Sequence, residues 1–323
     1  MINITSDLKM NRIGLGCMGM SEFYGSSNDN NSLNVMARAV DLGVNCFDTA
    51  DLYGDGHNEE LIGKFIKQSQ IKPAIATKCG IVRHKEILHD GNFKRTYNGS
   101  AKYISDSCEA SLKRLGIECI DLFYLHRPDP NTPIEESVEA LAKLKAQGKI
   151  KAIGLSEVSS GDLARAQRVH PIDCLQSEYS LWSREVEASI LPFCQQNNIT
   201  FVAFSPLGRG LTKPSINLEQ TDFRTNIPRF SAHNMSANRP LFDLIDTIGK
   251  RYSASSAQVC LAWLLNQAPN LMAIPGTRHI KYLEQNVLAQ NIALTEEELK
   301  RLDTAFSPEK VQGEKYLVST SAA

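Results

Sequence analysis

The sequence predicts a closed barrel of eight parallel strands, each followed by a helix. Apolar runs of four to seven residues alternate with helical patterns from one end of the chain to the other, and no linker interrupts them. The length of 323 residues exceeds the roughly 250 that such a barrel needs. We therefore expect residues 1–323 to form one α/β domain, a (β/α)8 TIM barrel with long loops at the C-terminal face.

Each predicted strand is a short apolar run, and the segments between the strands carry apolar residues three and four positions apart. Leu33, Met36 and Val40 mark one such helical face. A capping box is predicted at Thr132–Glu135, and glycines at 43, 116 and 148 are expected to end helices in the left-handed conformation. A second capping box joins Thr295 and Glu298. The predicted strands are 12–16, 44–48, 73–78, 120–126, 151–156, 173–177, 201–205 and 272–276.

Composition excludes several classes of protein. Apolar residues are 42% and charged residues 22%, which is typical of a globular protein. The net charge of −1 gives no sign of a nucleic-acid partner. The longest apolar run, 259–265, is far shorter than the ~18 residues of a membrane span. The first twelve residues lack the pattern of a signal peptide, and the eight cysteines form no Cys-x-x-Cys pair, so we expect a cytoplasmic protein with reduced thiols.

Two long polar segments, 83–100 and 207–238, follow predicted strands and are expected to be loops at the catalytic face. Familiar motifs fit poorly elsewhere. Residues 14–19 match Gly-x-Gly-x-x-Gly, but no helix opens after them, so we expect a glycine-rich strand end that lets a ligand approach the backbone. Residues 154–158 lack the second glycine of a nucleophile elbow, and 56–64 is one residue too long for a P-loop. His84 and His89 lack metal-ligand spacing, and no metal site is predicted.

Four polar residues at or near the ends of three neighbouring strands suggest catalysis. They are Asp48, Tyr53, Lys78 and His126. In a barrel such strand ends point to one place. A tyrosine phenol titrates near pH 10, and a neighbouring ammonium is expected to lower that pKa. With an aspartate holding the lysine and a histidine orienting a carbonyl, the group can act as a general acid in carbonyl reduction, which also needs a hydride donor.

Eight stretches together resemble the aldo-keto reductase family over residues 14–302. They are 14–20, 47–54, 77–80, 121–127, 154–157, 176–180, 204–210 and 274–278. The resemblance implies that Asp48, Tyr53, Lys78 and His126 are the catalytic tetrad, with Tyr53 as the general acid. Residues 16–25 look most like the microbial and plant branch that reduces varied aldehydes and ketones.

The resemblance also implies NADPH or NADP as cofactor. Ser156 and Gln176 match the carboxamide ligands, Phe204 the ring stacked on nicotinamide, and Ser205, Leu207 and Gly210 the pyrophosphate loop. Gln285 and Asn286 match the adenine contacts, and Arg278, before a helix predicted at 280–289, suits a 2′-phosphate. The further residues expected to contact the cofactor are Gly16, Cys17, Met18, Asp48, Gly208, Gly276 and Thr277.

The chain departs from common family patterns at several of these positions. Glu157 stands where many branches have asparagine, Gly276 and Thr277 replace a frequent Lys-Ser, and Gln285 replaces a frequent glutamate. The 2′-phosphate contact therefore depends more on Arg278, together with Lys281 or Tyr282. What Glu157 does in place of asparagine is open at this point.

The substrate is not readable beyond its class, a small carbonyl compound. Phe23, Tyr24, Phe93, Arg127 and Trp182 are candidates for its pocket, and each is equally consistent with packing. The alternative function is a nicotinamide-bound regulatory or sensor subunit with slow or no turnover. The complete tetrad and the lack of an extra N-terminal segment favour an enzyme. The sequence does not decide between a monomer and a homo-oligomer.

Overall fold

The computed structural model describes residues 1–87, 93–216, 218 and 222–316, and its centre is a parallel eight-stranded sheet. The strands are neighbours in chain order, as the sequence predicts for a barrel. Each predicted strand is present, with bounds that differ by up to three residues. The strands are β3 (Leu15–Gly16), β4 (Cys46–Asp48), β5 (Ala74–Cys79), β8 (Ile120–Leu125), β9 (Ile150–Ser156), β10 (Cys174–Glu178), β11 (Thr200–Phe204) and β12 (Leu271–Ala273).

The sheet closes where the first strand meets the last. Ile13 pairs with Ala273, and Gly16 pairs with Gly276, both in parallel bridges. A Cβ atom on Gly16 would lie 2.6 Å from the carbonyl oxygen of Ile274, so only glycine allows this approach. Gly16 thus admits the neighbouring strand, and the expectation that this strand end also lets a ligand approach the backbone stays a prediction.

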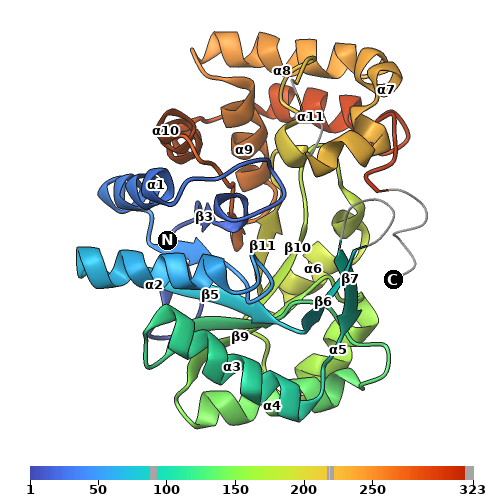
Figure 1. Ribbon diagram of the computed structural model, residues 1–323. Helices are drawn as coiled ribbons and strands as arrows, with labels where there is room; N and C mark the ends of the chain where they lie inside the picture. The colour runs from blue at the N-terminus through green and yellow to red at the C-terminus, as the bar shows by residue number, and fades with distance from the viewer. Residues whose placement is uncertain (88–92, 217, 219–221, 317–323) are drawn as a thin grey trace.

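Helices surround the sheet (Figure 1). The residues of the predicted helical faces that point inward include Met36, Ile104, Val138 and Leu141, all fully buried. The helices are α1 (Asp29–Asp41), α2 (His57–Ser69), α3 (Ala101–Leu115), α4 (Ile134–Ala146), α5 (Ser160–Val169), α6 (Ile190–Gln196), α7 (Ala232–Ala237), α8 (Arg239–Arg251), α9 (Ser256–Asn266), α10 (Ile280–Leu288) and α11 (Glu296–Ala305).

The predicted helix ends are confirmed except at α4. Gly43, Gly116 and Gly148 have φ of +80°, +66° and +74°. The capping box of Thr295 is present at α11. At α4 the N-cap is Pro133 and has no side-chain hydrogen bond. Thr132 instead donates its hydroxyl to Asp129 Oδ2 at 2.7 Å, which removes it from the cap.

An N-terminal hairpin covers the end of the barrel at which the parallel strands begin. The sequence pattern did not indicate this hairpin. Its strands are β1 (Ile2–Asn3) and β2 (Lys9–Met10). Ile2, Ile4, Leu8 and Met10 join the interior side chains of the barrel in one buried cluster. Asn45, at the start of β4, fixes the hairpin because it accepts from Asn11 N at 2.8 Å and donates to Lys9 O at 3.1 Å.

The two segments expected to be loops contain regular structure. Residues 83–100 belong largely to an antiparallel hairpin of β6 (Ile81–Ile87) and β7 (Phe93–Tyr97), so the prediction of a loop was wrong there. Its paired strands are highly charged between their apolar ends, which hides the usual strand signal. Residues 88–92, including His89, lie outside the described part. The described residues of 207–238 include short 3₁₀ helices at Gly208–Gly210, Phe223–Asn226 and Pro228–Phe230, followed by α7.

Among the described helices, none is long and apolar enough to cross a membrane. The longest apolar run of the sequence lies in α9, whose residues from Val259 to Leu265 are all buried. All eight cysteines are unpaired, and seven of them are buried. In the ranges that the structure describes, no group of three or more His, Cys, Asp or Glu residues is placed to hold a metal ion.

Candidate active site

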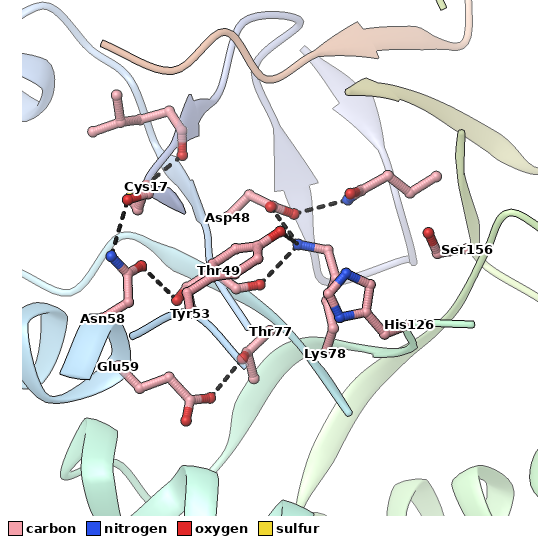
Figure 2. Close-up of polar contacts among 12 residues, drawn as sticks. Cys17, Asp48, Thr49, Tyr53, Asn58, Glu59, Thr77, Lys78, His126 and Ser156 are labelled. Carbon is pink, nitrogen blue, oxygen red and sulfur yellow. Dashed lines mark hydrogen bonds and ion pairs between the residues drawn. The ribbon is translucent and has the colours of Figure 1, made fainter. Parts of the chain in front are cut away.

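The structure brings together the four residues of the predicted tetrad. Asp48 ends β4, Lys78 is near the end of β5, and His126 directly follows β8. Tyr53 lies in the turn between β4 and α2. Because β4, β5 and β8 are adjacent and parallel, these positions meet at one edge of the barrel. Figure 2 shows the four side chains converging, and their exposed fractions are 8% or less.

The Lys78 ammonium directs all three of its N–H groups at oxygen atoms. It donates to Asp48 Oδ1 at 2.5 Å, to Thr49 O at 2.8 Å and to Tyr53 OH at 3.4 Å. Burial disfavours the charged lysine, but Asp48 and Tyr53 outweigh burial and raise the pKa of Lys78. The lysine therefore stays charged. Because the Tyr53 oxygen accepts from Lys78, its own hydrogen is free to point toward a substrate.

Burial raises the pKa of the Tyr53 phenol, and the Lys78 cation opposes this effect without reversing it. We expected the lysine to lower this pKa below its usual value, so the balance in this structure differs from that expectation. The physical reason is that Tyr53 loses most of its contact with water, which destabilises the phenolate. The phenol consequently holds its proton at neutral pH, which is the form that a general acid needs.

His126 is a neutral imidazole. Burial lowers its pKa well below the usual value, and the cations of Lys78 and Arg127 lower it further. Its ring lies edge-on to the Tyr53 ring, with 5.9 Å between the centroids. Its Nδ1 is buried and has no hydrogen-bond partner among the described residues. A neutral histidine beside the phenol can donate one hydrogen bond to a carbonyl oxygen.

Asn58 holds the segment that carries Tyr53, and the sequence analysis missed it. Its Oδ1 accepts from Thr49 Oγ1 at 2.7 Å, and its Nδ2 donates to Cys17 O at 2.9 Å and to Ser21 Oγ at 2.7 Å. Its backbone N–H donates to Tyr53 O. The available signal was a polar residue on an apolar helical face, since Asn58 shares the spacing of the buried residues 61, 62 and 65.

A second group of polar residues contacts β5 next to Lys78. Glu59 is fully buried and accepts from Thr77 Oγ1 at 2.5 Å and from Arg114 Nε at 2.7 Å. Burial and the neighbouring Glu59 carboxylate raise the pKa of Asp51 to about 8. Asp51 donates its backbone N–H to Lys78 O. Residues 56–64, which resemble a P-loop in sequence, thus form the start of α2. The Glu59 carboxylate in this segment binds Thr77 on β5.

The two side chains expected to bind a carboxamide lie beside the tetrad on the next strands. Ser156 and Gln176 are register partners on β9 and β10. Gln176 donates its Nε2 to Asp48 Oδ2 at 2.8 Å, which ties the expected cofactor side of the site to the catalytic side. Arg127 donates to Ser156 Oγ at 3.2 Å and to His126 O at 2.9 Å. Phe204, which ends β11, lies with its ring centroid 6.0 Å from the Arg127 guanidinium.

Glu157 directly follows β9 and contacts the backbone of β10. Its backbone is left-handed, with φ of +54°, a conformation that asparagine adopts more easily than glutamate. Its Oε1 accepts from the backbone N–H of Glu178 at 2.8 Å. The carboxylate therefore holds the end of β10.

The predicted pyrophosphate loop has an unusual backbone. Ser205, Gly208, Arg209 and Gly210 all have positive φ. Trp182 lies under this loop, since a Cβ atom on Gly208 would approach its ring to 2.5 Å. Within this loop the backbone N–H groups of Gly208 and Gly210 donate to Ser205 O and Leu207 O, at 2.9 and 3.0 Å. Leu207 is half-buried at the start of this loop.

The second predicted phosphate site precedes α10. Thr277 Oγ1 accepts from His279 N at 3.0 Å just before the helix begins. Arg278 donates to the backbone carbonyls of Tyr24 and Ser26, which joins this site to the loop after β3. Asn286 is buried in α10, and Gln285 beside it is half-buried.

Three further candidate residues lie in the segment that follows β3. Cys17 is fully buried and donates its backbone N–H to Asp48 O, so its side chain packs inward. Met18 begins the 3₁₀ turn at 18–20. Tyr24 packs edge-on against Phe223, with centroids 5.1 Å apart.

The candidate substrate residues separate into two groups. Phe23 and Phe93 lie close to each other, with centroids 6.3 Å apart, and belong to the apolar cluster that includes Tyr53. Trp182 is different, because its ring packs against Phe242 and Phe306 and is 3% exposed. The structure thus places Trp182 in the core, and we do not retain it as a substrate contact.

Comparisons with known proteins agree with this geometry. A family model described as aldo/keto reductase family matches residues 12–306. A protein of Glycine max named probable aldo-keto reductase 1 is 39% identical over 97% of this chain and 90% of its own. The structure of a glycerol dehydrogenase from Gluconobacter oxydans is similar with a TM-score of 0.86, at 29% identity over 95% of each chain. An aldo-keto reductase from Klebsiella pneumoniae in complex with NADPH has a TM-score of 0.72, at 26% identity over 94% of this chain and 95% of its own. With a matching model over most of its length and a buried Asp-Tyr-Lys-His group at the strand ends, the chain belongs to the aldo/keto reductase family.

Proposed function

We propose that this protein reduces aldehydes or ketones to alcohols with NADPH. The observation that carries the proposal is the contact of Lys78 with both Asp48 and Tyr53, next to a neutral His126. A buried phenol that accepts from an ammonium and keeps its own hydrogen is suited to protonating an alkoxide. NADPH, when bound, supplies the hydride that the carbonyl carbon receives.

In the proposed reaction Tyr53 and His126 act on the carbonyl oxygen. His126 donates a hydrogen bond that orients the carbonyl, and Tyr53 transfers its proton as negative charge develops on that oxygen. The Lys78 ammonium stabilises the phenolate that remains, since its N–H already points at the Tyr53 oxygen at 3.4 Å. Asp48 keeps the ammonium charged inside a buried site. The proton lost by Tyr53 is replaced from water after the product leaves.

The donor set on the C-terminal strands fits a nicotinamide dinucleotide. Ser156 and Gln176 offer a hydroxyl and an amide, which suit a neutral carboxamide. The start of α10 offers first-turn N–H groups suited to phosphates. The loop at 208–210 offers fewer, because the N–H groups of Gly208 and Gly210 donate to Ser205 O and Leu207 O. The neutral side chains proposed for the carboxamide thus lie on β9 and β10 next to the tetrad. The groups proposed for the phosphates follow β11 and β12. The other proposed cofactor contacts are Gly16, Cys17, Met18, Asp48, Phe204, Ser205, Leu207, Gly276, Thr277, Gln285 and Asn286.

Arg278 supports a preference for NADPH over NADH. Its guanidinium now contacts only backbone carbonyls among the described residues, at Tyr24 and Ser26. A guanidinium held by neutral carbonyls keeps its full charge for a 2′-phosphate, which only NADPH carries. Lys281 and Tyr282, in the first turn of α10, are exposed and lie within the same stretch of chain.

Tyr53→Phe tests the proposal. We expect this variant to bind NADPH nearly as tightly as the unchanged protein, as measured by nicotinamide fluorescence, and to lose reduction of a generic aldehyde. The variant removes only the proton donor, because the ring is retained in its apolar cluster. Unchanged turnover in Tyr53→Phe contradicts the mechanism. NADPH binding without turnover in the unchanged protein, over several aldehydes and ketones, favours a regulatory subunit instead.

A further inference from the structure

The tetrad lies among more positive than negative charges. The cations are Lys78 of the tetrad itself, Arg127 and Arg95, whose charges act on His126, and Arg83, which lies over Phe93 of the apolar cluster that includes Tyr53. The carboxylates in ion pairs with these cations are Asp48 and Glu22. Asp48 is paired with Lys78 at 2.5 Å, and Glu22 is paired with Arg83 at 2.7 Å. Four cations and two anions leave an excess of two positive charges, carried by Arg95 and Arg127.

Arg127 lies at the site itself and has unused donors. Its Nη1 donates to His126 O and Ser156 Oγ, which are both uncharged acceptors. Its charge opposes the rise in the pKa of Tyr53 and adds to the fall in the pKa of His126, as expected for a cation beside these side chains. Among the described residues, no ion pair joins Arg127 to a carboxylate.

Arg95 approaches the same place from the β6–β7 hairpin. Its guanidinium lies 4.7 Å from the Phe93 ring centroid and 5.4 Å from that of Phe23. Its charge also acts on His126, although with a smaller effect than that of Arg127. Within the described residues no ion pair joins Arg95 to a carboxylate. The Glu22 carboxylate acts on the Arg95 charge but is bound to Arg83.

Aromatic rings connect Arg95 to the catalytic tyrosine. Phe93 shares a buried apolar cluster with Tyr53, and Phe23 packs against this cluster. An apolar wall therefore extends from the general acid to a guanidinium. A substrate whose carbonyl lies at Tyr53 can place its carbon skeleton along this wall and its far end at Arg95.

The proposed cofactor does not account for the excess charge. Its phosphates are assigned to the loop at 205–210 and to the start of α10, which follow β11 and β12. The end of NADPH that faces the tetrad is an uncharged nicotinamide. Arg95 follows β5 along the chain, on the opposite half of the sheet order from β11 and β12.

We propose that the substrate is an aldehyde or ketone that also carries an anionic group, a carboxylate or a phosphate, bound by Arg95 and Arg127. Phe23 and Phe93 contact the carbon skeleton between the carbonyl and the anion. This inference rests on the proposed reductase function and names the substrate class of that site. A guanidinium with free N–H groups is the side chain best suited to bind either anion in two-point fashion.

Two aldehydes of similar shape test the proposal. One is 4-carboxybenzaldehyde, and the other is its uncharged methyl ester, methyl 4-formylbenzoate. The measured quantity is the ratio of kcat/KM for the acid to kcat/KM for the ester. Comparing this ratio between variants removes the difference in chemical reactivity of the two aldehydes.

Arg95→Met is compared with Lys94→Met, its neighbour on β7. Lys94 is an exposed cation paired with Glu86 at 2.9 Å, so the control makes the same change of charge on the same strand. We expect Arg95→Met to lower the acid-to-ester ratio about ten-fold, which corresponds to one charge-assisted contact, and Lys94→Met to leave it unchanged. Added salt should lower the ratio in the unchanged protein, since charges near the surface are screened.

An unchanged ratio in Arg95→Met, or an equal fall in Lys94→Met, overturns the proposal. The probe 4-formylphenyl phosphate distinguishes the two anions, because a larger advantage for it than for the carboxylate assigns the site to phosphate esters. Either preference supports an anionic substrate, and no preference over the ester contradicts it.

A binding measurement separates this inference from the proposed reaction. The alcohols 4-(hydroxymethyl)benzoate and its methyl ester cannot react with NADPH, so their affinity for the NADPH complex is measurable by nicotinamide fluorescence without turnover. We expect tighter binding of the acid, and a loss of this preference in Arg95→Met alone. If no aldehyde is reduced but this preference is present, the reductase function fails and the anion site stands. Equal binding of acid and ester removes the anion site whether or not the protein is a reductase.

Discussion

Replacing Asn58 by leucine tests whether the support of Tyr53 sets the rate of reduction. The side chain of Asn58 makes three hydrogen bonds, to Thr49, Cys17 and Ser21, and leucine has the same branched arrangement of heavy atoms without a polar atom. At about 1 kcal/mol for each bond, Asn58→Leu should lower the free energy of unfolding by about 3 kcal/mol. Urea denaturation measures this loss, with the buried Trp182 and Trp263 as fluorescent probes.

Asn45→Leu is the matched control at the other end of the barrel. Asn45 makes two hydrogen bonds to the backbone of the N-terminal hairpin, so this variant should lose about 2 kcal/mol of unfolding free energy. We expect Asn58→Leu to lower kcat at least about ten-fold, because Tyr53 is no longer held at a fixed position. Asn45→Leu should leave kcat unchanged. A full kcat in Asn58→Leu, or an equal fall in both variants, refutes a positioning role for Asn58.

Three further predictions concern single charges. Lys78→Met leaves the Asp48 carboxylate buried and unpaired, so urea denaturation should show a loss of about 3–5 kcal/mol, and adding Asp48→Asn should restore stability but not activity. Arg278→Ala should weaken NADPH at least about ten-fold and NADH much less, and equal losses in fluorescence titrations remove Arg278 from the 2′-phosphate site. Because burial lowers the pKa of His126, the unfolded chain binds a proton below about pH 6.5 that the folded chain does not, and stability falls there by up to about 1.4 kcal/mol per pH unit. His126→Gln should remove this part of the slope, and an identical slope contradicts the buried neutral histidine.

The strand ends and the tetrad were predictable because each depends on local pattern. An apolar run that ends in Asp48, Lys78 or His126 is visible in the sequence, and barrel geometry then brings the three ends together. The support of these residues was harder to see. Asn58 and Glu59 lie only a few residues after Tyr53, but their role depends on contacts with residues 17 and 114, which no local pattern indicates.

The two hairpins were missed for a different reason. The strands β1 and β2 have two residues each, too few for any alternation to appear. The strands β6 and β7 are long enough, but the charged side chains of residues 83–86 and 94–95 resemble a solvated loop. Their pairing becomes visible only when Arg83 and Arg95 are seen to lie over Phe93, with guanidinium-to-centroid distances of 3.5 and 4.7 Å.

The junction of β3 with β12 has a consequence for synthesis of the chain. Arg12 donates to the carbonyls of Leu271 and Ala268, at 3.1 and 2.7 Å. Strand β3 can therefore pair with β12 only after residue 273 has left the ribosome. Until then the emerging chain carries two open sheet edges, which invite pairing with other chains. The tetrad is contained in the first 126 residues, but Gln176 and the proposed cofactor loops come later. A partly synthesised chain would therefore contain the proposed general acid, Tyr53, without the residues that we assign to NADPH binding. Reduction would become possible only after β12 has been made.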